Sequence, residues 1–184
     1  ELNIENCYAK GPVKGQKKVG GFIGEFSPTK ITLKNSYATG EVIATEDDAG
    51  GFIGQIKRSV NTLSNTIENS YATGNVEGKS NVGGFIGNIM NSGGSVDINI
   101  NNCYSIGNIT GMISLGGFIG SNSAGAGVIT NCYYDEDTSG KSDTGKGEPR
   151  STSDMRKKTT YTSWDFTTIW KINEGVSYPI FKWQ

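Results

Sequence analysis

Two short stretches of this 184-residue sequence carry side chains that could do chemistry, and the first has the spacing of half a calcium-binding loop. Asp135, Asp137 and Ser139, followed by Gly140, match the pattern Asp-x-Asp-x-Ser-Gly that supplies the first oxygen ligands of such a loop. The twelfth position of the loop requires a bidentate glutamate, and here it is Lys146, whose charge repels the ion. We therefore expect a solvated acidic turn, with no metal site and no cofactor.

The second stretch is a run of three carboxylates, Glu46, Asp47 and Asp48, between two apolar segments. Paired carboxylates can cleave glycosidic bonds without histidine, so a polysaccharide-active β-helix enzyme is one interpretation of this run. No second acidic cluster can be paired with it from the sequence, and three acids in tandem on one turn are typical of a solubilising surface. We predict that the chain has no catalytic residue and is not an enzyme, and we keep a lyase or glycosidase as the alternative.

The composition excludes several other classes of chemistry. The sequence contains no histidine, which rules out a Ser-His-Asp triad, a Cys-His dyad and a histidine-ligated zinc ion. With 17 basic and 18 acidic residues the net charge is −1, so no overall field attracts nucleic acid or an anionic membrane. No apolar run approaches the roughly 20 residues of a membrane helix, and we expect no membrane insertion by this segment.

The residues around these stretches form a repeat. An asparagine followed by Cys or Ser and then Tyr recurs at intervals of 29, 34, 33 and 29 residues. The five asparagines are Asn6, Asn35, Asn69, Asn102 and Asn131. The phrase Gly-Gly-Phe-Ile-Gly follows each of the first four after 14 or 15 residues. A fixed period of this length is the signature of a solenoid or a propeller.

Each repeat is predicted to hold about three short strands separated by glycine-rich corners. An aliphatic residue stands two positions before each asparagine, and this alternation is typical of a strand with one buried face. Such a unit buries its apolar face only when neighbouring units stack on it. We therefore predict an all-β fold, a parallel, right-handed β-helix-like β-solenoid of four to five coils, with a propeller fragment or a sandwich as the alternatives.

Stacking gives the repeated residues structural roles. We expect the five asparagines to form a ladder of hydrogen-bonded amides, one in each coil. The glycine pairs are expected to allow positive φ and close approach of backbones, and not to bind phosphate, because no helix pattern follows them. Each phenylalanine of the phrase points either outward, as an aromatic binding stripe, or inward beside the next isoleucine, and we favour the inward arrangement. These phenylalanines are Phe22, Phe52, Phe85 and Phe118.

The three cysteines occupy the second position of the motif. Cys103 and Cys132 fall on adjacent rungs, about 4.8 Å apart at the spacing of strands, so a bridge between them stays open. In-register neighbours on a parallel ladder point side by side, which strains a disulfide, and Cys7 lies three coils from Cys103. We predict three reduced thiols in a small slot that serine fills in the other coils.

The tandem phrases NSYATG and GGFIG resemble the GLUG-motif repeat family, whose Gly-Leu-apolar-Gly segment corresponds to GGFIG here. The resemblance covers residues 1–134, with phenylalanine where the family usually has an aliphatic residue. Such repeats occur in bacterial surface and secreted proteins, including adhesin-like proteins and immunoglobulin-A-cleaving metallopeptidases, whose zinc motif lies outside the repeats. The resemblance implies an extracellular location, at the bacterial cell surface or secreted, and it supplies no catalytic residue.

The last fifty residues differ from the repeats, so we expect a solenoid over 1–134 and a C-terminal capping segment over 135–184. A polar stretch predicts a long loop, and Ser151 or Thr152 is expected to begin a short helix. The three tryptophans, Trp164, Trp170 and Trp183, follow this stretch. They form either a carbohydrate-stacking platform or an apolar lid over the open end of the solenoid, and we favour the lid.

Together these features predict a non-catalytic extracellular repeat module of a bacterial surface protein, acting in adhesion or as a projecting scaffold. A purely mechanical spacer is a further alternative. The expected partners are a host glycan or matrix protein and the neighbouring repeats of a longer parent chain, with no nucleic acid. Because the variable half of each repeat carries the polar residues, we expect a ligand to contact this insertion side, including residues 55–68 and 88–101.

Overall fold

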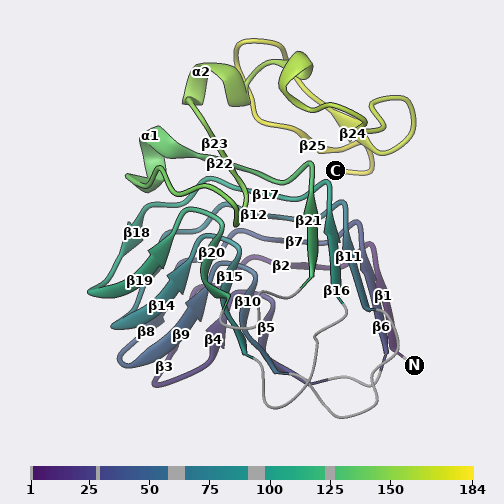
Figure 1. The fold of residues 1–184 in the computed structure, drawn as a ribbon. Helices are drawn as coiled ribbons and strands as arrows, with labels where there is room; N and C mark the ends of the chain where they lie inside the picture. The colour runs from purple at the N-terminus through teal and green to yellow at the C-terminus, as the bar shows by residue number, and fades with distance from the viewer. Residues whose placement is uncertain (1, 28–29, 58–64, 91–97, 123–126) are drawn as a thin grey trace.

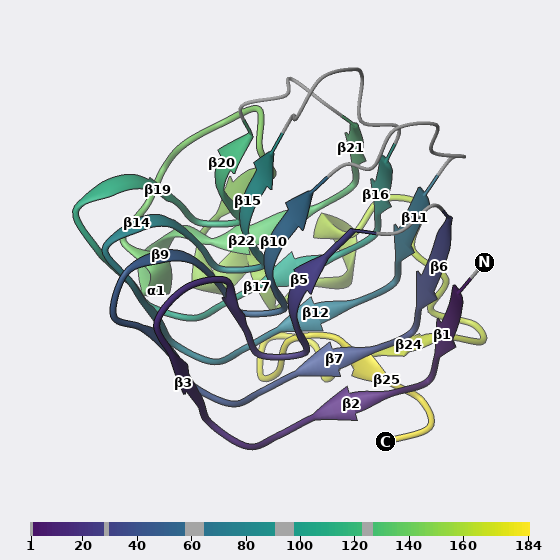
Figure 2. The ribbon, with the colours of Figure 1, turned by 90° about the horizontal axis from the view of Figure 1, so that it is seen from below.

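The computed structural model describes residues 2–27, 30–57, 65–90, 98–122 and 127–184. Within these ranges the chain forms a parallel β-solenoid, as predicted, and each repeat contributes strands to a common set of five sheets. Figure 1 shows the coils stacked from the purple N-terminal repeat to the green C-terminal repeat. In Figure 2 the chain turns clockwise as it runs from the near, purple coil into the coils behind it, which is a right-handed winding.

The sheets are named A to E in the order in which the chain enters them. Sheet A contains β1 (Leu2–Glu5), β6 (Ile31–Lys34), β11 (Asn65–Glu68), β16 (Ile98–Asn101) and β21 (Val128–Thr130). Sheet B contains β2 (Tyr8–Ala9), β7 (Tyr37–Ala38), β12 (Tyr71–Ala72), β17 (Tyr104–Ser105), β22 (Tyr133–Asp135) and β23 (Glu148–Arg150). Sheet C contains β3 (Val13–Gly15), β8 (Val42–Ala44), β13 (Val76–Glu77) and β18 (Ile109–Thr110). Sheet D contains β4 (Val19–Gly20), β9 (Asp47–Gly50), β14 (Ser80–Gly83) and β19 (Ile113–Gly116), and sheet E contains β5 (Ile23–Phe26), β10 (Ile53–Lys57), β15 (Ile86–Met90) and β20 (Ile119–Asn122).

Strands of one sheet pair in parallel, and equivalent residues of consecutive repeats lie side by side. In sheet A, for example, Leu33 pairs with Ile4 on one side and with Ile67 on the other. Sheets C, D and E each contain four strands. From the first strand to the fourth, the chain therefore advances by three strand spacings along the solenoid axis. The repeat period of the sequence is therefore the length of one coil.

Each repeat forms five short strands where the sequence predicts about three. Two breaks account for the difference: the asparagine corner divides the predicted first strand between sheets A and B, and the glycine pair divides the predicted third strand between sheets D and E. A left-handed corner at the start of sheet D then folds the chain back, so sheets C and D face each other. The residues with positive φ at this corner are Lys18, Asp48, Asn81 and Ser114. A small core fills the space between the two sheets, with Val42, Val76 and Ile109 from sheet C and Ala49 and Val82 from sheet D.

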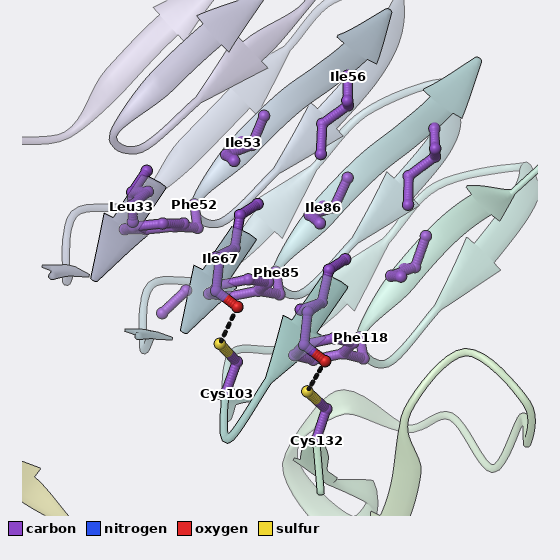
Figure 3. Packing of buried hydrophobic residues seen from close by; sticks show 14 of the residues in the cluster. Leu33, Phe52, Ile53, Ile56, Ile67, Phe85, Ile86, Cys103, Phe118 and Cys132 are labelled. Carbon is purple, nitrogen blue, oxygen red and sulfur yellow. Dashed lines mark hydrogen bonds between the residues drawn. The ribbon is translucent and has the colours of Figure 1, made fainter. Parts of the chain in front are cut away.

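The main core lies between sheets A and E and contains both apolar residues of the Gly-Gly-Phe-Ile-Gly phrase (Figure 3). Phe52, Phe85 and Phe118 are fully buried, and the rings of consecutive coils stack with centroids 4.8 Å apart. Ile53 and Ile86, which follow two of these phenylalanines, are also fully buried. The inward arrangement is therefore confirmed, and the phrase forms no exposed aromatic stripe in these coils.

The glycines of the phrase let backbones approach each other where sheets D and E meet. A Cβ atom on Gly51 would lie 2.2 Å from the carbonyl oxygen of Gly84 in the next coil. A Cβ atom on Gly54 would lie 2.5 Å from the carbonyl carbon of Lys18, which directly precedes β4 of sheet D in the preceding coil. None of the phrase's glycines has positive φ, so that expectation is wrong, and close approach alone explains their presence.

The segment from residue 152 onward packs beside the solenoid, on the outer face of sheet B (Figure 1). It contains α2 (Thr152–Met155), the 3₁₀ helix η1 (Lys158–Thr160) and the antiparallel pair β24 (Trp170–Lys171) and β25 (Ile180–Phe181). Ser151 begins α2 as predicted, because its hydroxyl accepts a hydrogen bond from the Asp154 N–H. We refer to residues 152–184 as the side cap.

Other residues close the C-terminal end of the solenoid. The Tyr134 ring lies against Gly117, where the next coil would otherwise continue. Its hydroxyl donates to the Asp143 carbonyl at 2.7 Å, and the Asp143 carboxylate accepts from the Gly117 N–H at 3.0 Å. Gly147 covers Phe118, and the segment between Tyr134 and Gly147 includes the short helix α1 (Glu136–Ser139).

Candidate functional site

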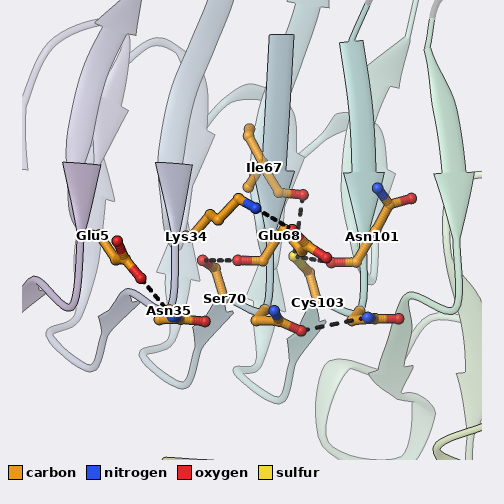
Figure 4. A network of polar contacts seen from close by, with 10 residues as sticks. Glu5, Lys34, Asn35, Ile67, Glu68, Ser70, Asn101 and Cys103 are labelled. Atoms are coloured by element: carbon orange, nitrogen blue, oxygen red, sulfur yellow. Dashed lines mark hydrogen bonds and ion pairs between the residues drawn. The ribbon is translucent and has the colours of Figure 1, made fainter. Parts of the chain in front are cut away.

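The asparagines of the motif form the corner between sheets A and B. All five have positive φ, between 48° and 55°. Asparagine tolerates this left-handed conformation better than most residues, so it can turn the chain sharply from one sheet into the next. An amide contact of the expected kind runs from Asn102 Nδ2 to Asn69 Oδ1 at 3.4 Å. Asn35 Nδ2 instead donates to Glu5 Oε1 at 3.2 Å (Figure 4). We infer that the backbone conformation is the main role of these residues and that the amide contacts add to it.

The cysteines are free thiols, as predicted, with Cys7 exposed and Cys103 and Cys132 buried. Cys103 Sγ donates to the carbonyl of Asn101 at 3.1 Å, and Ser70 Oγ makes the equivalent contact with Glu68 in the preceding coil (Figure 4). Figure 3 shows Cys103 and Cys132 at equivalent places in adjacent coils. Burial raises the pKa of the Cys103 thiol well above its ordinary value, so this group is a poor nucleophile.

The three carboxylates of the acidic run have different partners. Glu46 forms an ion pair with Lys17 at 2.9 Å, and Asp47 accepts a hydrogen bond from the Ser80 hydroxyl of the next coil. Asp48 is 6 % exposed, so the expectation of a solubilising surface is wrong for this residue. Each carboxylate of the run is therefore engaged by different partners.

Asp48 is the centre of a buried polar seam between sheets D and E. Its carboxylate accepts hydrogen bonds from Gln55 Nε2 at 2.5 Å, Asn81 Nδ2 at 2.8 Å and Asn88 Nδ2 at 3.0 Å. Two of these three donors, Asn81 and Asn88, belong to the next coil. Within the described ranges, Gln55 Oε1 and Asn88 Oδ1 are buried without a hydrogen-bond partner. The seam therefore ties neighbouring coils together at the polar junction of two sheets.

The calcium-like turn anchors the side cap. Asp135 is fully buried, and its carboxylate accepts from the Thr138 N–H at 3.1 Å, the Thr152 hydroxyl at 2.7 Å and the Tyr178 hydroxyl at 2.6 Å. Asp137 accepts from the Thr152 N–H at 2.7 Å. The expectation of a solvated turn is wrong for Asp135, because the side cap folds back over it and supplies two of its donors.

The tyrosines of the motif form a stack on the outer face of sheet B. The ring centroids of Tyr37 and Tyr71, and of Tyr71 and Tyr104, are 5.0 Å apart, and those of Tyr8 and Tyr37 are 5.4 Å apart. From Tyr37 onward the side cap covers this stack with buried apolar residues, which are Met155, Tyr161, Trp164, Trp170 and Phe181, whereas Tyr8 is 57% exposed. The motif tyrosine therefore supplies the surface on which the side cap folds.

The tryptophans have two different environments. Trp164 is 7 % exposed and Trp170 is fully buried, and both contact the Tyr104 ring. Trp183 is 45 % exposed and stacks on Phe181 with centroids 5.2 Å apart. The predicted lid therefore exists, but its place was predicted wrongly, because the tryptophans cover the side of the solenoid and not its open end.

Hydrogen bonds from the tyrosine stack hold the side cap in place. The Tyr104 hydroxyl donates to the Pro179 carbonyl at 2.5 Å, and the Tyr71 hydroxyl donates to Gln184 Oε1 at 2.9 Å. Burial raises the pKa of both phenols above the ordinary value, so both remain protonated donors at neutral pH.

The described residues include only part of the predicted insertion side. Segments 58–64 and 91–97 lie outside the described residues. The strands that flank them, β10 and β11 for the first and β15 and β16 for the second, occupy part of the ranges 55–68 and 88–101 assigned to insertions by sequence. Those ranges were therefore too wide, since Ile56 and Ile67 belong to the core.

Sequence reasoning missed the partnership between the tyrosine stack and the side cap. The spacing concealed it, because the period-two pattern places each motif tyrosine on the same face as the aliphatic residue four positions before it, and the left-handed corner at the asparagine reverses that face. Outward tyrosines in successive coils favour a cover, and the aromatic segment after the last repeat is the part of the sequence that matches it.

Comparison with known proteins gives one informative relative. The chain is 40% identical over 157 residues to a protein of Evansella cellulosilytica named "Putative Gly-rich membrane protein". The match covers 82% of this chain and 14% of that protein, so the chain spans a small part of its relative's length. No family model matches the chain, and no solved structure matches it. Among the described residues, no helix has the length and apolarity needed to cross a membrane.

Proposed function

We propose that this chain is a non-catalytic extracellular module of a bacterial surface protein, which projects other segments and takes part in adhesion. The fold alone does not assign a function, so the proposal rests on how the side chains are used. The similarity to one stretch of a much longer protein is consistent with a module that serves within a larger chain.

One observation carries the proposal. In the inner coils the repeated residues have packing roles. Phenylalanine and isoleucine lie in the core, glycine lies at the sheet junction, and tyrosine lies beneath the side cap. Repetition here maintains a stack and does not form a reactive centre. A rigid stack with variable connections is an arrangement that supports binding through its loops.

The polysaccharide-active enzyme remains the alternative from another class. It would require two facing carboxylates, and the most acidic run of the chain instead pairs with Lys17, Ser80 and the amides of the polar seam. Incubating the chain with a panel of polysaccharides and measuring reducing ends tests this directly. We expect no release above the background, and turnover that depends on any of Glu46, Asp47 or Asp48 would overturn the non-catalytic proposal.

Adhesion is tested by probing arrays of host glycans and matrix proteins with a multimerised form of the chain, because binding by one module is expected to be weak. The informative variant replaces only residues 58–64 and 91–97 with Gly-Ser segments of equal length, which leaves β10, β11, β15 and β16 intact. An unchanged melting temperature is the control for folding. We expect binding to be lost. Retained binding would refute the proposal that segments 58–64 and 91–97 bind the ligand. The lack of any ligand for the unaltered chain would favour a mechanical spacer.

A further inference from the structure

Two adjoining hollows lie on the side cap. The first has a volume of about 220 Å³ and is lined by Lys158, Phe166, Trp170, Lys171, Ile172 and Lys182. The second has a volume of about 200 Å³ and is lined by Lys171, Ile172, Asn173, Ser177 and Ile180. Because both are lined by Lys171 and Ile172, they are neighbours across a shared wall.

The first hollow is cationic. Lys158 Nζ lies 5.2 Å from the centroid of the Phe166 ring, and Lys182 Nζ donates to the Thr167 carbonyl at 2.6 Å. Lys158, Lys171 and Lys182 are all exposed, and none of them forms an ion pair with another described residue. No acidic residue of the described ranges lines the hollow. Three positive charges that converge without an ion-paired carboxylate attract an anionic group.

One acidic residue near this hollow, Asp165, stabilises a turn of the backbone. Asp165 lies close enough to Lys182 for their charges to interact. Its carboxylate, however, accepts hydrogen bonds from the Thr167 N–H at 2.7 Å, the Thr168 N–H at 2.8 Å and the Thr168 hydroxyl. The lysine ammonium groups therefore keep donors for a ligand.

A second acidic residue contacts the backbone of Lys158. Glu174 Oε1 accepts from the Lys158 N–H at 3.0 Å, and Glu174 is exposed to solvent. Solvent screens an exposed carboxylate, and Glu174 does not line the hollow. The net charge of the lining residues therefore stays positive.

The same hollow borders a buried donor without an acceptor. Trp170 is fully buried, and its Nε1 has no hydrogen-bond partner within the described ranges. A buried donor left unpaired costs about 1–3 kcal/mol, so such groups usually have a partner or a use. Because this Nε1 is itself buried, it is not accessible to a ligand in the hollow and adds no donor to the site.

The second hollow adds a different kind of surface. Ile172 and Ile180 form its aliphatic part, and Ile180 is 37% exposed. Asn173 and Ser177 stand beside them and provide an amide and a hydroxyl. Aliphatic faces beside a few polar groups suit the C–H faces and hydroxyl edges of a sugar ring.

We propose that these two hollows form one binding site for an acidic polysaccharide, with a carboxylate or sulfate group at Lys158, Lys171 and Lys182 and a sugar ring against Ile172 and Ile180. The proposal deepens the adhesion role and rests on it, but it concerns residues of the side cap and not segments 58–64 and 91–97. A nucleic acid or an acidic peptide would use the lysines without needing the aliphatic hollow, and both serve as comparison ligands.

Binding is measured by titrating the whole chain at low salt with polygalacturonate, which carries carboxylates, and with heparin, which also carries sulfates, while dextran serves as the neutral control. Tryptophan fluorescence reports the site because Trp170 lines it. The test variant is Lys158→Gln/Lys171→Gln/Lys182→Gln. The matched control, Lys10→Gln/Lys14→Gln/Lys17→Gln, removes the same charge from exposed positions on the first coil.

We expect at least one acidic polysaccharide to bind, dextran not to bind, and the dissociation constant to rise at least tenfold in the test variant and less than twofold in the control. Affinity for that polysaccharide should fall with added salt. An equal loss in both variants, equal binding of dextran, or tighter binding of single-stranded DNA or poly-glutamate than of either polysaccharide would overturn the site. If the arrays reveal a ligand held by segments 58–64 and 91–97 while both acidic polysaccharides fail, only this inference falls and the adhesion proposal stands.

Discussion

Single residues in this molecule often have a role that differs from the obvious chemistry of their side chains. The motif asparagines were expected to act through their amides, yet their shared property is positive φ at a corner. Asp48 and Asp135 were expected to be solvated, yet both are buried acceptors that join separate parts of the chain. These residues could be singled out from the sequence because they recur or cluster. Their partners could not be found in this way, since those come from another coil or from the side cap.

The corner role of asparagine can be separated from its amide contact at Asn69. Asn69→Gly and Asn69→Ala both remove the contact with Asn102, but only glycine accepts positive φ without strain. We therefore expect the alanine variant to be less stable than the glycine variant by about 1 kcal/mol. Urea unfolding measures the difference. Equal destabilisation by the two substitutions would show that the amide contact dominates.

The buried phenols predict how stability depends on pH. Burial raises the pKa of Tyr71, Tyr104 and Tyr161 above the ordinary value of about 10. Between that value and the raised one, the unfolded chain has lost these protons and the folded chain has kept them. The contribution of these phenols to the free energy of unfolding should therefore be fully present below about pH 10. It should fall as the pH rises above that value.

Urea unfolding at intervals between about pH 8 and about pH 11.5, on either side of the ordinary phenol pKa, tests this dependence. The Tyr71→Phe variant, which keeps the ring but not the titrating group, should show a shallower fall than the unaltered chain. A free energy of unfolding that stays level or rises above about pH 10 would contradict the burial of these phenols.

At the scale of the elements, the junction of sheets D and E explains the most repeated phrase in the sequence. The first glycine ends a strand of sheet D, the phenylalanine and isoleucine enter the main core, and the last glycine lets sheet E approach the backbone of sheet D. The structural role of the phrase and the inward direction of its side chains could be predicted from the sequence. The spacing did not show that the phrase spans sheets D and E, because a glycine pair inside a strand pattern does not by itself mark where one sheet ends and the next begins.

The close approach at this junction predicts a large effect of a single methyl group. A Cβ on Gly51 would meet the Gly84 carbonyl, whereas a Cβ on Gly11 would have open space around it, with no atom beyond its chain neighbours within 4 Å. We expect Gly51→Ala to lower the free energy of unfolding by about 3 kcal/mol, because the backbones must separate. Gly11→Ala is the matched control and should change it by less than about 0.5 kcal/mol. Comparable unfolding midpoints for the two variants would argue against this packing.

On the scale of the whole molecule, the solenoid is closed at one end and covered on one side. Tyr134 and Gly147 seal the C-terminal coil, and the side cap lies along the tyrosine stack. The period, the parallel stacking and the presence of an aromatic cover could be predicted, because each is encoded by regular spacing or by local composition. The position of the cover could not, since it depends on contacts between residues far apart in the chain, such as Tyr71 and Gln184.

The central claim is that each repeated phrase forms one coil of a parallel stack, and a crystal structure of this chain tests it most directly. We predict that Asn35, Asn69 and Asn102 will stand at the same corner of three consecutive coils with positive φ, on strands about 4.8 Å apart. The Phe52 and Phe85 rings should stack inside the core. Antiparallel pairing of these strands, or asparagines scattered over the surface, would contradict the account.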